Sequence, residues 1–227
     1  MVALGLMPRR AGELPAEVTG FVGRAAELAQ LTALMETARL VTVTGTGGVG
    51  KTRVALRAAA LASGRYPDEG VCLVELSGLR DPELLPFTVA ACLGLSQSDA
   101  QLDTVLDYLH DRKLLLILDT CEHVLDACAT LADALLRAAP GVTVLATSRQ
   151  PLGVPGEHPR AIQPLPVDGA DSPGGDSGGD AVELLAQRAA ALSSSKAGIR
   201  PVPRPSTGRC RWWASSAATS GSVSAWR

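Results

Sequence analysis

A lysine and a threonine follow a glycine-rich stretch at a spacing suited to binding a phosphate group. Residues 45–52 read Gly-Thr-Gly-Gly-Val-Gly-Lys-Thr and fit the pattern Gly-x4-Gly-Lys-Thr. Glycines let the backbone turn its N–H groups towards phosphate oxygens, while Lys51 would neutralise the β- and γ-phosphates and the Thr52 hydroxyl would ligate Mg²⁺. The residues expected to contact a bound phosphate ligand here are Gly45, Thr46, Gly47, Gly48, Val49, Gly50, Lys51, Thr52 and Arg53.

The segments on either side of this stretch are predicted to be a strand and a helix. Residues 40–44 are apolar and β-branched, which is typical of a buried strand, and residues 53–62 combine strong helix formers with apolar residues at helical spacing. A helix N-terminus adds unpaired N–H groups and partial positive charge that favour an anion. The alternative is a chance glycine-rich turn, but eight residues in register with these flanks favour a nucleotide-binding P-loop.

A second apolar run, residues 113–119, ends abruptly in the carboxylate of Asp119. A buried parallel strand takes this form when its C-terminal end opens into a ligand site. We therefore expect Asp119 to hold Mg²⁺, directly or through water, opposite Thr52. The alternative is that Asp119 is the N-cap of the following helix.

The residues after Asp119 bear on whether a nucleotide would be hydrolysed. Many hydrolysing P-loop ATPases carry a second acid at the next position, but this chain has Thr120 there. Glu122 is a candidate for positioning the attacking water, and it could equally be an ordinary acid in the first turn of a helix. His123 is expected in a loop or cap instead of in a ligand set. These residues predict slow hydrolysis.

A third apolar run, residues 142–147, is followed by Ser148 and Arg149. An arginine at the C-terminal end of a strand can donate bidentate bonds to a phosphate, so we expect Arg149 to sense the γ-phosphate. The alternative is an exposed arginine that enters a loop. The catalytic candidates are thus Lys51, Asp119, Glu122 and Arg149.

A short segment ahead of the P-loop could contact the base of the nucleotide. Residues 21–24, Phe-Val-Gly-Arg, precede a helical pattern at residues 25–38. Because aromatic residues make up only 3% of the chain, we expect backbone and aliphatic contacts from Val22 and Gly23 rather than ring stacking. An ordinary N-terminal core helix is the alternative.

The remaining pattern divides the chain of 227 residues into one main domain and appendages. Further strands are predicted at residues 71–76 and 158–165, and further helices at 82–93, 102–110, 124–138 and 181–192. The predicted organisation is a flexible lead-in (1–15), a nucleotide-binding domain (16–166), a Gly/Ser/Asp linker (167–180), a helix that begins a truncated subdomain (181–194) and a basic, disordered tail (195–227).

Composition excludes several classes of protein. Apolar content of 46% is ample for a core, and a net charge of −2 gives no case for a nucleic-acid-coating or membrane-binding surface. Five scattered cysteines without a C-x-x-C pair favour reduced thiols over a disulfide framework or a zinc site. Without a signal-peptide pattern or a run long enough to span a membrane, the chain is expected to be cytoplasmic.

Taken together, the motifs resemble those of signal-transduction ATPases with numerous domains (STAND), and most closely the NB-ARC-type modules of large bacterial transcriptional regulators. The motifs that carry the resemblance are residues 21–24, 45–52, 115–123 and 146–149. It implies an α/β fold of the ASCE P-loop NTPase type, in three layers, with a five-stranded parallel sheet in the order 5-1-4-3-2. It also implies a switch that holds ADP at rest and ATP when signalling.

The chain also departs from that family. Thr120 stands where the subgroup usually has asparagine, and the helical subdomain, winged helix and repeats that follow in the family are not visible. The amino-acid composition changes after about Ser194, where basic residues occur without acidic ones. One hypothesis for this change is a frameshifted or truncated gene. Of the family's partners, only the adenine nucleotide is expected to bind this chain. Whether the chain forms a nucleotide-dependent oligomer is left open.

We therefore predict a switch domain that binds ATP or ADP with Mg²⁺ and hydrolyses ATP slowly. The nearest alternatives are an interaction module that holds ADP without turnover, or a non-functional fragment of a regulator. A small-molecule kinase would need an arginine-bearing lid that is not visible. DNA binding by the basic tail is the remaining alternative, and it is not expected for this chain.

Overall fold

The structure is a computed structural model that describes residues 14–15, 20–66, 70–96, 101–165, 181 and 184–189. The chain divides into two units, Met1–Arg188 and Ala189–Arg227, and every element named below belongs to the first. The predicted linker at 167–180 and tail at 195–227 lie outside the described residues, as does nearly all of the predicted lead-in. Within the predicted helix at 181–192, residues 181 and 184–189 are helical.

Five parallel strands form the central sheet. Their bounds are β1 Leu40–Thr44, β2 Val71–Glu75, β3 Leu114–Asp119, β4 Val142–Ser148 and β5 Glu157–Ala161. The spatial order is β2-β3-β4-β1-β5, so the predicted order 5-1-4-3-2 is confirmed. In this order β4 lies between the P-loop strand β1 and the strand β3 that ends in Asp119.

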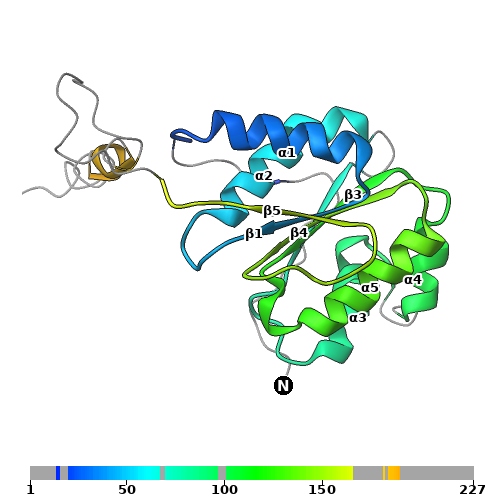
Figure 1. Cartoon of the computed structure of the whole chain (residues 1–227). Coiled ribbons are helices and arrows are strands. Elements are labelled where there is room, and N and C mark those ends of the chain that lie inside the picture. The colour runs from blue at the N-terminus through cyan, green and yellow to red at the C-terminus, as the bar shows by residue number, and fades with distance from the viewer. Residues whose placement is uncertain are drawn as a thin grey trace, which may run out of the picture. The chain divides into compact units, whose positions relative to one another are not determined.

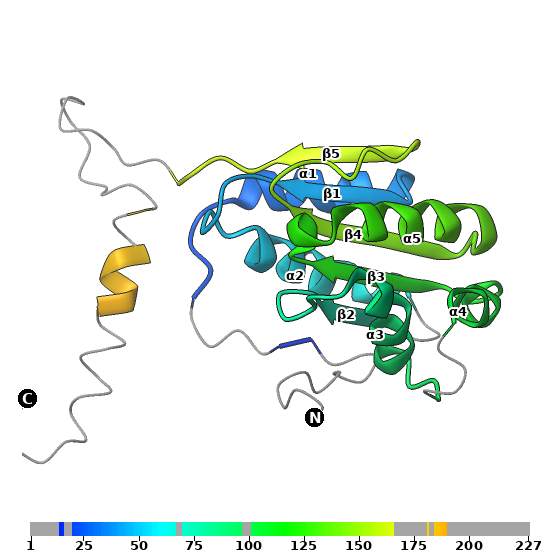
Figure 2. The ribbon, with the colours of Figure 1, turned by 90° about the horizontal axis from the view of Figure 1, so that it is seen from below.

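Helices cover both faces of the sheet, which makes three layers (Figures 1 and 2). One face carries α1 Ala25–Thr37 and α2 Lys51–Ala62, and the other carries α3 Leu85–Cys92, α4 Leu102–Leu109 and α5 Leu125–Ala138. Crossover helices of this kind bury parallel strands on both sides, which explains why β1, β2, β3 and β4 are largely apolar, whereas the edge strand β5 is polar and partly exposed.

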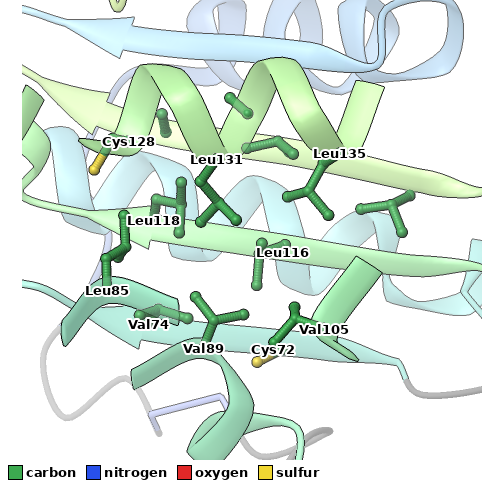
Figure 3. Close-up of a cluster of buried hydrophobic side chains, with 14 of the residues drawn as sticks. Cys72, Val74, Leu85, Val89, Val105, Leu116, Leu118, Cys128, Leu131 and Leu135 are labelled. Atoms are coloured by element: carbon green, nitrogen blue, oxygen red, sulfur yellow. The ribbon is translucent and has the colours of Figure 1, made fainter. Parts of the chain in front are cut away.

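Alternate residues of the four inner strands β1 to β4 enter two separate cores. Val41, Ile117 and Leu145 pack with the helices α1 and α2, whereas Leu116, Leu118 and Val144 pack with α3, α4 and α5. Figure 3 shows the second core, in which Leu131 and Leu135 of α5 meet the strand residues. The period of two along these strands therefore decides which of the two cores each side chain enters.

The predicted elements agree with the observed ones to within a few residues, with two informative differences. The helix expected at 82–93 begins as a 3₁₀ turn, Pro82–Leu84, in which the Asp81 carboxylate accepts a hydrogen bond from the N–H of Glu83. The strand expected at 158–165 ends at Ala161, although Ile162 still donates to Thr44 of β1.

The expectation of five reduced cysteines is wrong for two of them. Cys72 of β2 and Cys92 of α3 form a disulfide, with their Cα atoms 6.4 Å apart. The pair forms because α3 packs directly on β2, and a spacing of 20 residues gave no local signal of it. Cys121 and Cys128 are buried free thiols.

Among the residues that the structure describes, none of the helices has the length and apolar character needed to cross a membrane.

Candidate functional site

The side chains of Thr52 and Asp119 meet at the C-terminal edge of the sheet. Thr52 lies in the first turn of α2, and its hydroxyl donates a hydrogen bond of 2.7 Å to Oδ1 of Asp119, the last residue of β3. Asp119 is buried, with 8% of its surface exposed. The alternative role of Asp119 as a helix cap is not observed, because the N-cap of the next turn is Thr120 and no side chain caps it. Hydroxyl and carboxylate oxygens in this arrangement are a suitable ligand pair for Mg²⁺.

Two further hydroxyl groups, from Thr147 and Thr120, surround Asp119. Thr147, near the end of β4, donates to Oδ1 of Asp119 at 2.7 Å and accepts a hydrogen bond of 2.9 Å from the N–H of Thr120. Thr120 itself has a positive φ of 66°, an unusual conformation for a β-branched residue. Its hydroxyl donates to the other carboxylate oxygen of Asp119 at 3.2 Å. The Asp119 carboxylate is therefore fixed by neighbours from three parts of the chain.

Lys51 is a buried cation beside the glycine-rich loop. Its Nζ donates to the carbonyl oxygens of Gly45 and Thr46 at 3.0 and 3.1 Å. Within the described part of the chain no carboxylate forms an ion pair with Lys51, although only 9% of the residue is exposed. A buried charge without a counter-ion is costly, so this loop fits an anionic ligand.

The loop has the backbone conformations that its glycines allow. Gly48 and Gly50 have positive φ values of 77° and 97°, and a Cβ on Gly45 would lie 2.8 Å from the carbonyl oxygen of Ile162. Gly50 is also the N-cap of α2 and supplies no side-chain acceptor to the N–H groups of the first turn. These N–H groups are therefore suited to a phosphate ligand.

A cavity of about 410 Å³ adjoins the loop, and its size is suited to a small organic ligand. Its lining includes Phe21, Val22, Gly48, Val49, Arg53 and Pro164. Val22 thus lies where base contacts were predicted, but Gly23 does not line the cavity. The Arg53 guanidinium lies over the Phe21 ring, 5.7 Å from its centroid, and donates to the Gly20 carbonyl oxygen at 2.8 Å.

Arg24 is a residue of this region whose role was not predicted. Its Nη2 donates to the carbonyl oxygens of Val49 in the P-loop and of Gln163 after β5, both at 2.9 Å. The side chain is buried, and it joins three segments that are far apart in the sequence. No local sequence pattern indicated this role, because it depends on how distant segments pack.

The two remaining catalytic candidates contact each other instead of Asp119. Glu122 lies in a 3₁₀ turn, Cys121–His123, and its Oε1 is 3.3 Å from Nε of Arg149. The Nη2 of Arg149 lies 3.5 Å from the position that a Cβ on Gly47 would occupy, so this guanidinium is beside the P-loop. The Nε2 of His123 is 2.8 Å from the carbonyl oxygen of Leu76, which agrees with the predicted loop role.

The buried thiol next to the site is not a nucleophile. A hydrogen bond with Cys128, together with burial, raises the pKa of Cys121 far above its ordinary value. The thiolate is the reactive form of cysteine, so a protonated and fully buried Cys121 stays inert.

The sheet order, the glycine loop ahead of α2 and the hydroxyl–carboxylate pair at the strand ends define the P-loop NTPase fold, in the form with an extra strand between β1 and β3. Two solved structures share this fold. The first is a STAND protein with a tetratricopeptide repeat sensor from Pyrococcus horikoshii, with a TM-score of 0.51 and 18% identity over 80% of this chain and 27% of that one. The second is a Walker-type ATPase of Pyrococcus abyssi, with a TM-score of 0.54 and 14% identity over 83% of this chain and 62% of that one.

Sequence relatives occur in Mycobacterium and Streptomyces. The chain is 38% identical over 159 residues to a Mycobacterium tuberculosis protein named as an HTH-type transcriptional regulator, covering 69% of this chain and 17% of that protein. It is 36% identical over 179 residues to an uncharacterised protein of the same organism, covering 78% and 43%. It is 32% identical over 152 residues to the regulatory protein AfsR of Streptomyces griseus, covering 60% and 15%. The chain thus spans less than half of each of these relatives, and no family model matches it.

Proposed function

We propose that this chain is an NB-ARC-type nucleotide switch that binds ATP or ADP together with Mg²⁺ and hydrolyses ATP slowly. The observation that carries the proposal is the hydrogen bond of 2.7 Å between Thr52 and Asp119, which joins the P-loop helix to the acid at the end of β3. The buried Lys51, with no carboxylate partner among the described residues, supports it independently.

In this proposal the P-loop from Gly45 to Gly50 holds the phosphates and Lys51 neutralises their charge. Thr52 and Asp119 hold Mg²⁺, which would neutralise charge on the β- and γ-phosphates. Val22 and Arg53 contact the rest of the nucleotide in the adjoining cavity, and Arg149 senses the γ-phosphate.

The proposed biological setting comes from the relatives. Two of them are named as regulators, and the chain matches only a small part of each. We propose that a nucleotide-binding domain at residues 16–166 acts in the cytoplasm as one module of a transcriptional regulator, whose DNA-binding part is a separate domain.

Calorimetric titration of the purified chain with ATP and ADP, in Mg²⁺ or in EDTA, tests nucleotide binding. Lys51→Ala is expected to weaken the binding of both nucleotides by about 100-fold, because a charge-assisted contact to phosphate is lost. Lys113→Ala, at the opposite end of β3, is the matched control and should bind as the wild type does. Binding of neither nucleotide by the wild-type chain would refute the proposal.

The metal role has its own test. Thr52→Ala is expected to weaken ATP binding in Mg²⁺ and to leave binding in EDTA nearly unchanged, because only the Mg²⁺ ligand is removed. Thr52→Ser keeps the hydroxyl and should retain the Mg²⁺ effect. An equal loss in both buffers for Thr52→Ala would exclude metal ligation by this residue.

An interaction module that holds ADP without turnover is the second candidate. It is favoured by Thr120, which stands directly after Asp119 at the position where many hydrolysing P-loop ATPases carry a second acid. Single-turnover hydrolysis of labelled ATP separates the two candidates: formation of ADP over minutes to hours supports a slow ATPase, and its absence supports the module.

A further inference from the structure

We propose that Glu122 is a positioning residue that holds Arg149 over the P-loop and thereby sets the preference for ATP over ADP. This inference rests on the proposed function, because it assigns a specificity role within the same nucleotide site. It differs from the water-positioning role predicted for Glu122, because Glu122 here acts through an arginine.

The contact leaves the phosphate-binding edge of the guanidinium free. Glu122 engages Nε of Arg149 at 3.3 Å, whereas Nη2 is the atom that lies beside Gly47 of the P-loop. An arginine held by its Nε still presents both terminal nitrogens in a planar fork that matches phosphate oxygens. The carboxylate therefore directs the guanidinium without occupying the part that would bind a ligand.

The two side chains differ in how firmly they are held. The Arg149 side chain is 67% exposed, so in the absence of a partner it would populate many rotamers. The Glu122 side chain is only 22% exposed and belongs to a 3₁₀ turn that follows β3 directly. His123 of the same turn bonds to Leu76, which fixes the turn against the end of β2. The firmly placed acid can thus restrict the mobile arginine.

Restricting Arg149 in this position would favour the nucleotide that reaches it. An arginine that is already oriented loses less conformational entropy when it binds a phosphate. Because Arg149 is the predicted γ-phosphate contact, the gain applies to ATP, and ADP lacks the group that would benefit. Glu122 should therefore change the ratio of the ATP affinity to the ADP affinity. It should not change both affinities by the same factor.

The test measures dissociation constants for ADP and for the β,γ-imido analogue of ATP, both with Mg²⁺, by calorimetry. Arg149→Met is expected to weaken the analogue about tenfold or more, and the length-matched Glu122→Met about two- to fivefold, with ADP binding unchanged in both. Glu122→Gln keeps an acceptor for Nε and should show a smaller loss. In the double variant, Glu122→Met should add nothing to the effect of Arg149→Met.

The matched control is Asp133→Asn, which breaks an exposed arginine–carboxylate pair with Arg137 on α5. It should leave both affinities unchanged. An equal loss for ADP and the analogue in Glu122→Met would assign Glu122 a structural role and overturn the inference. A gain in analogue affinity would also overturn it, because Glu122 would then compete with the phosphate for Arg149. If wild-type protein binds neither nucleotide, the proposed function itself fails and the inference fails with it.

Discussion

Replacing Thr147 by valine tests how the acid at the centre of the site is held. Thr147→Val keeps the branched shape, but Asp119 loses a hydrogen bond of 2.7 Å and the N–H of Thr120 loses its acceptor at 2.9 Å. A hydrogen bond to a charged group contributes about 1.5–3 kcal/mol, and a buried N–H without a partner costs about 1–3 kcal/mol. Because both losses involve one oxygen atom and the chain can relax, we expect a destabilisation of about 2–4 kcal/mol.

The chain offers a matched control for this substitution in the same sheet. Thr42 of β1 is also fully buried, but its hydroxyl has no hydrogen-bond partner within the part of the chain that the structure describes. Thr42→Val therefore removes an unsatisfied polar group without breaking a bond, and it should be neutral or stabilise the fold by about 1 kcal/mol. Two chemically identical changes are thus expected to have effects of different size and sign.

Urea unfolding followed by circular dichroism, in EDTA and without nucleotide, gives the free energy of unfolding for each variant. Thr147→Ser keeps the hydroxyl and should lose no more than about 1 kcal/mol for the missing methyl group. If Thr147→Val and Thr42→Val destabilise the protein equally, the hydroxyl of Thr147 is not what holds Asp119 and Thr120, and the reasoning is refuted.

Three further predictions concern residues around the site. Arg39→Met should lower the free energy of unfolding in urea by about 2–3 kcal/mol, because the guanidinium donates to four carbonyl oxygens at the end of α5 and the start of β4. A full return of stability in Arg39→Lys would contradict this. Arg24→Lys should weaken ATP binding about tenfold in calorimetry, because a single ammonium group replaces the guanidinium that joins the P-loop to the segment after β5. An unchanged affinity would argue against that coupling. Cys121 should react with iodoacetamide roughly 100-fold more slowly in native than in urea-unfolded protein, as measured by mass spectrometry. The reason is that its hydrogen bond with Cys128 and its burial raise its pKa. Equal rates in the two states would contradict this prediction.

Much of the fold could be predicted because the information is local. Apolar, β-branched runs ended by glycine or polar residues predicted the strands, and the run that ends in Asp119 matches β3 to within one residue. The strand order came from the resemblance to a family, since periodicity alone does not say which strands are neighbours. The pairing of Thr52 with Asp119 followed from the P-loop pattern together with the rule that ligands bind at the carboxyl ends of parallel strands.

The features that escaped prediction depend on how distant segments pack. Thr147 is the last residue of the apolar run predicted at 142–147, but its bond to Asp119 requires β4 to lie directly beside β3. Arg24 donates to Gln163, which lies 139 residues later in the chain, and no local sequence pattern predicts a contact between residues so far apart. The Cys72–Cys92 disulfide likewise arises from the packing of α3 on β2.

The position of β1 has a consequence for when the proposed nucleotide site can form during synthesis. The strand pairs with β4 on one side and with β5 on the other, and both are made roughly a hundred residues later. A chain emerging from the ribosome therefore carries the entire glycine loop long before the strand in front of it has either neighbour. Nucleotide-binding competence should appear late in synthesis and abruptly, once β4 and β5 have both left the exit tunnel.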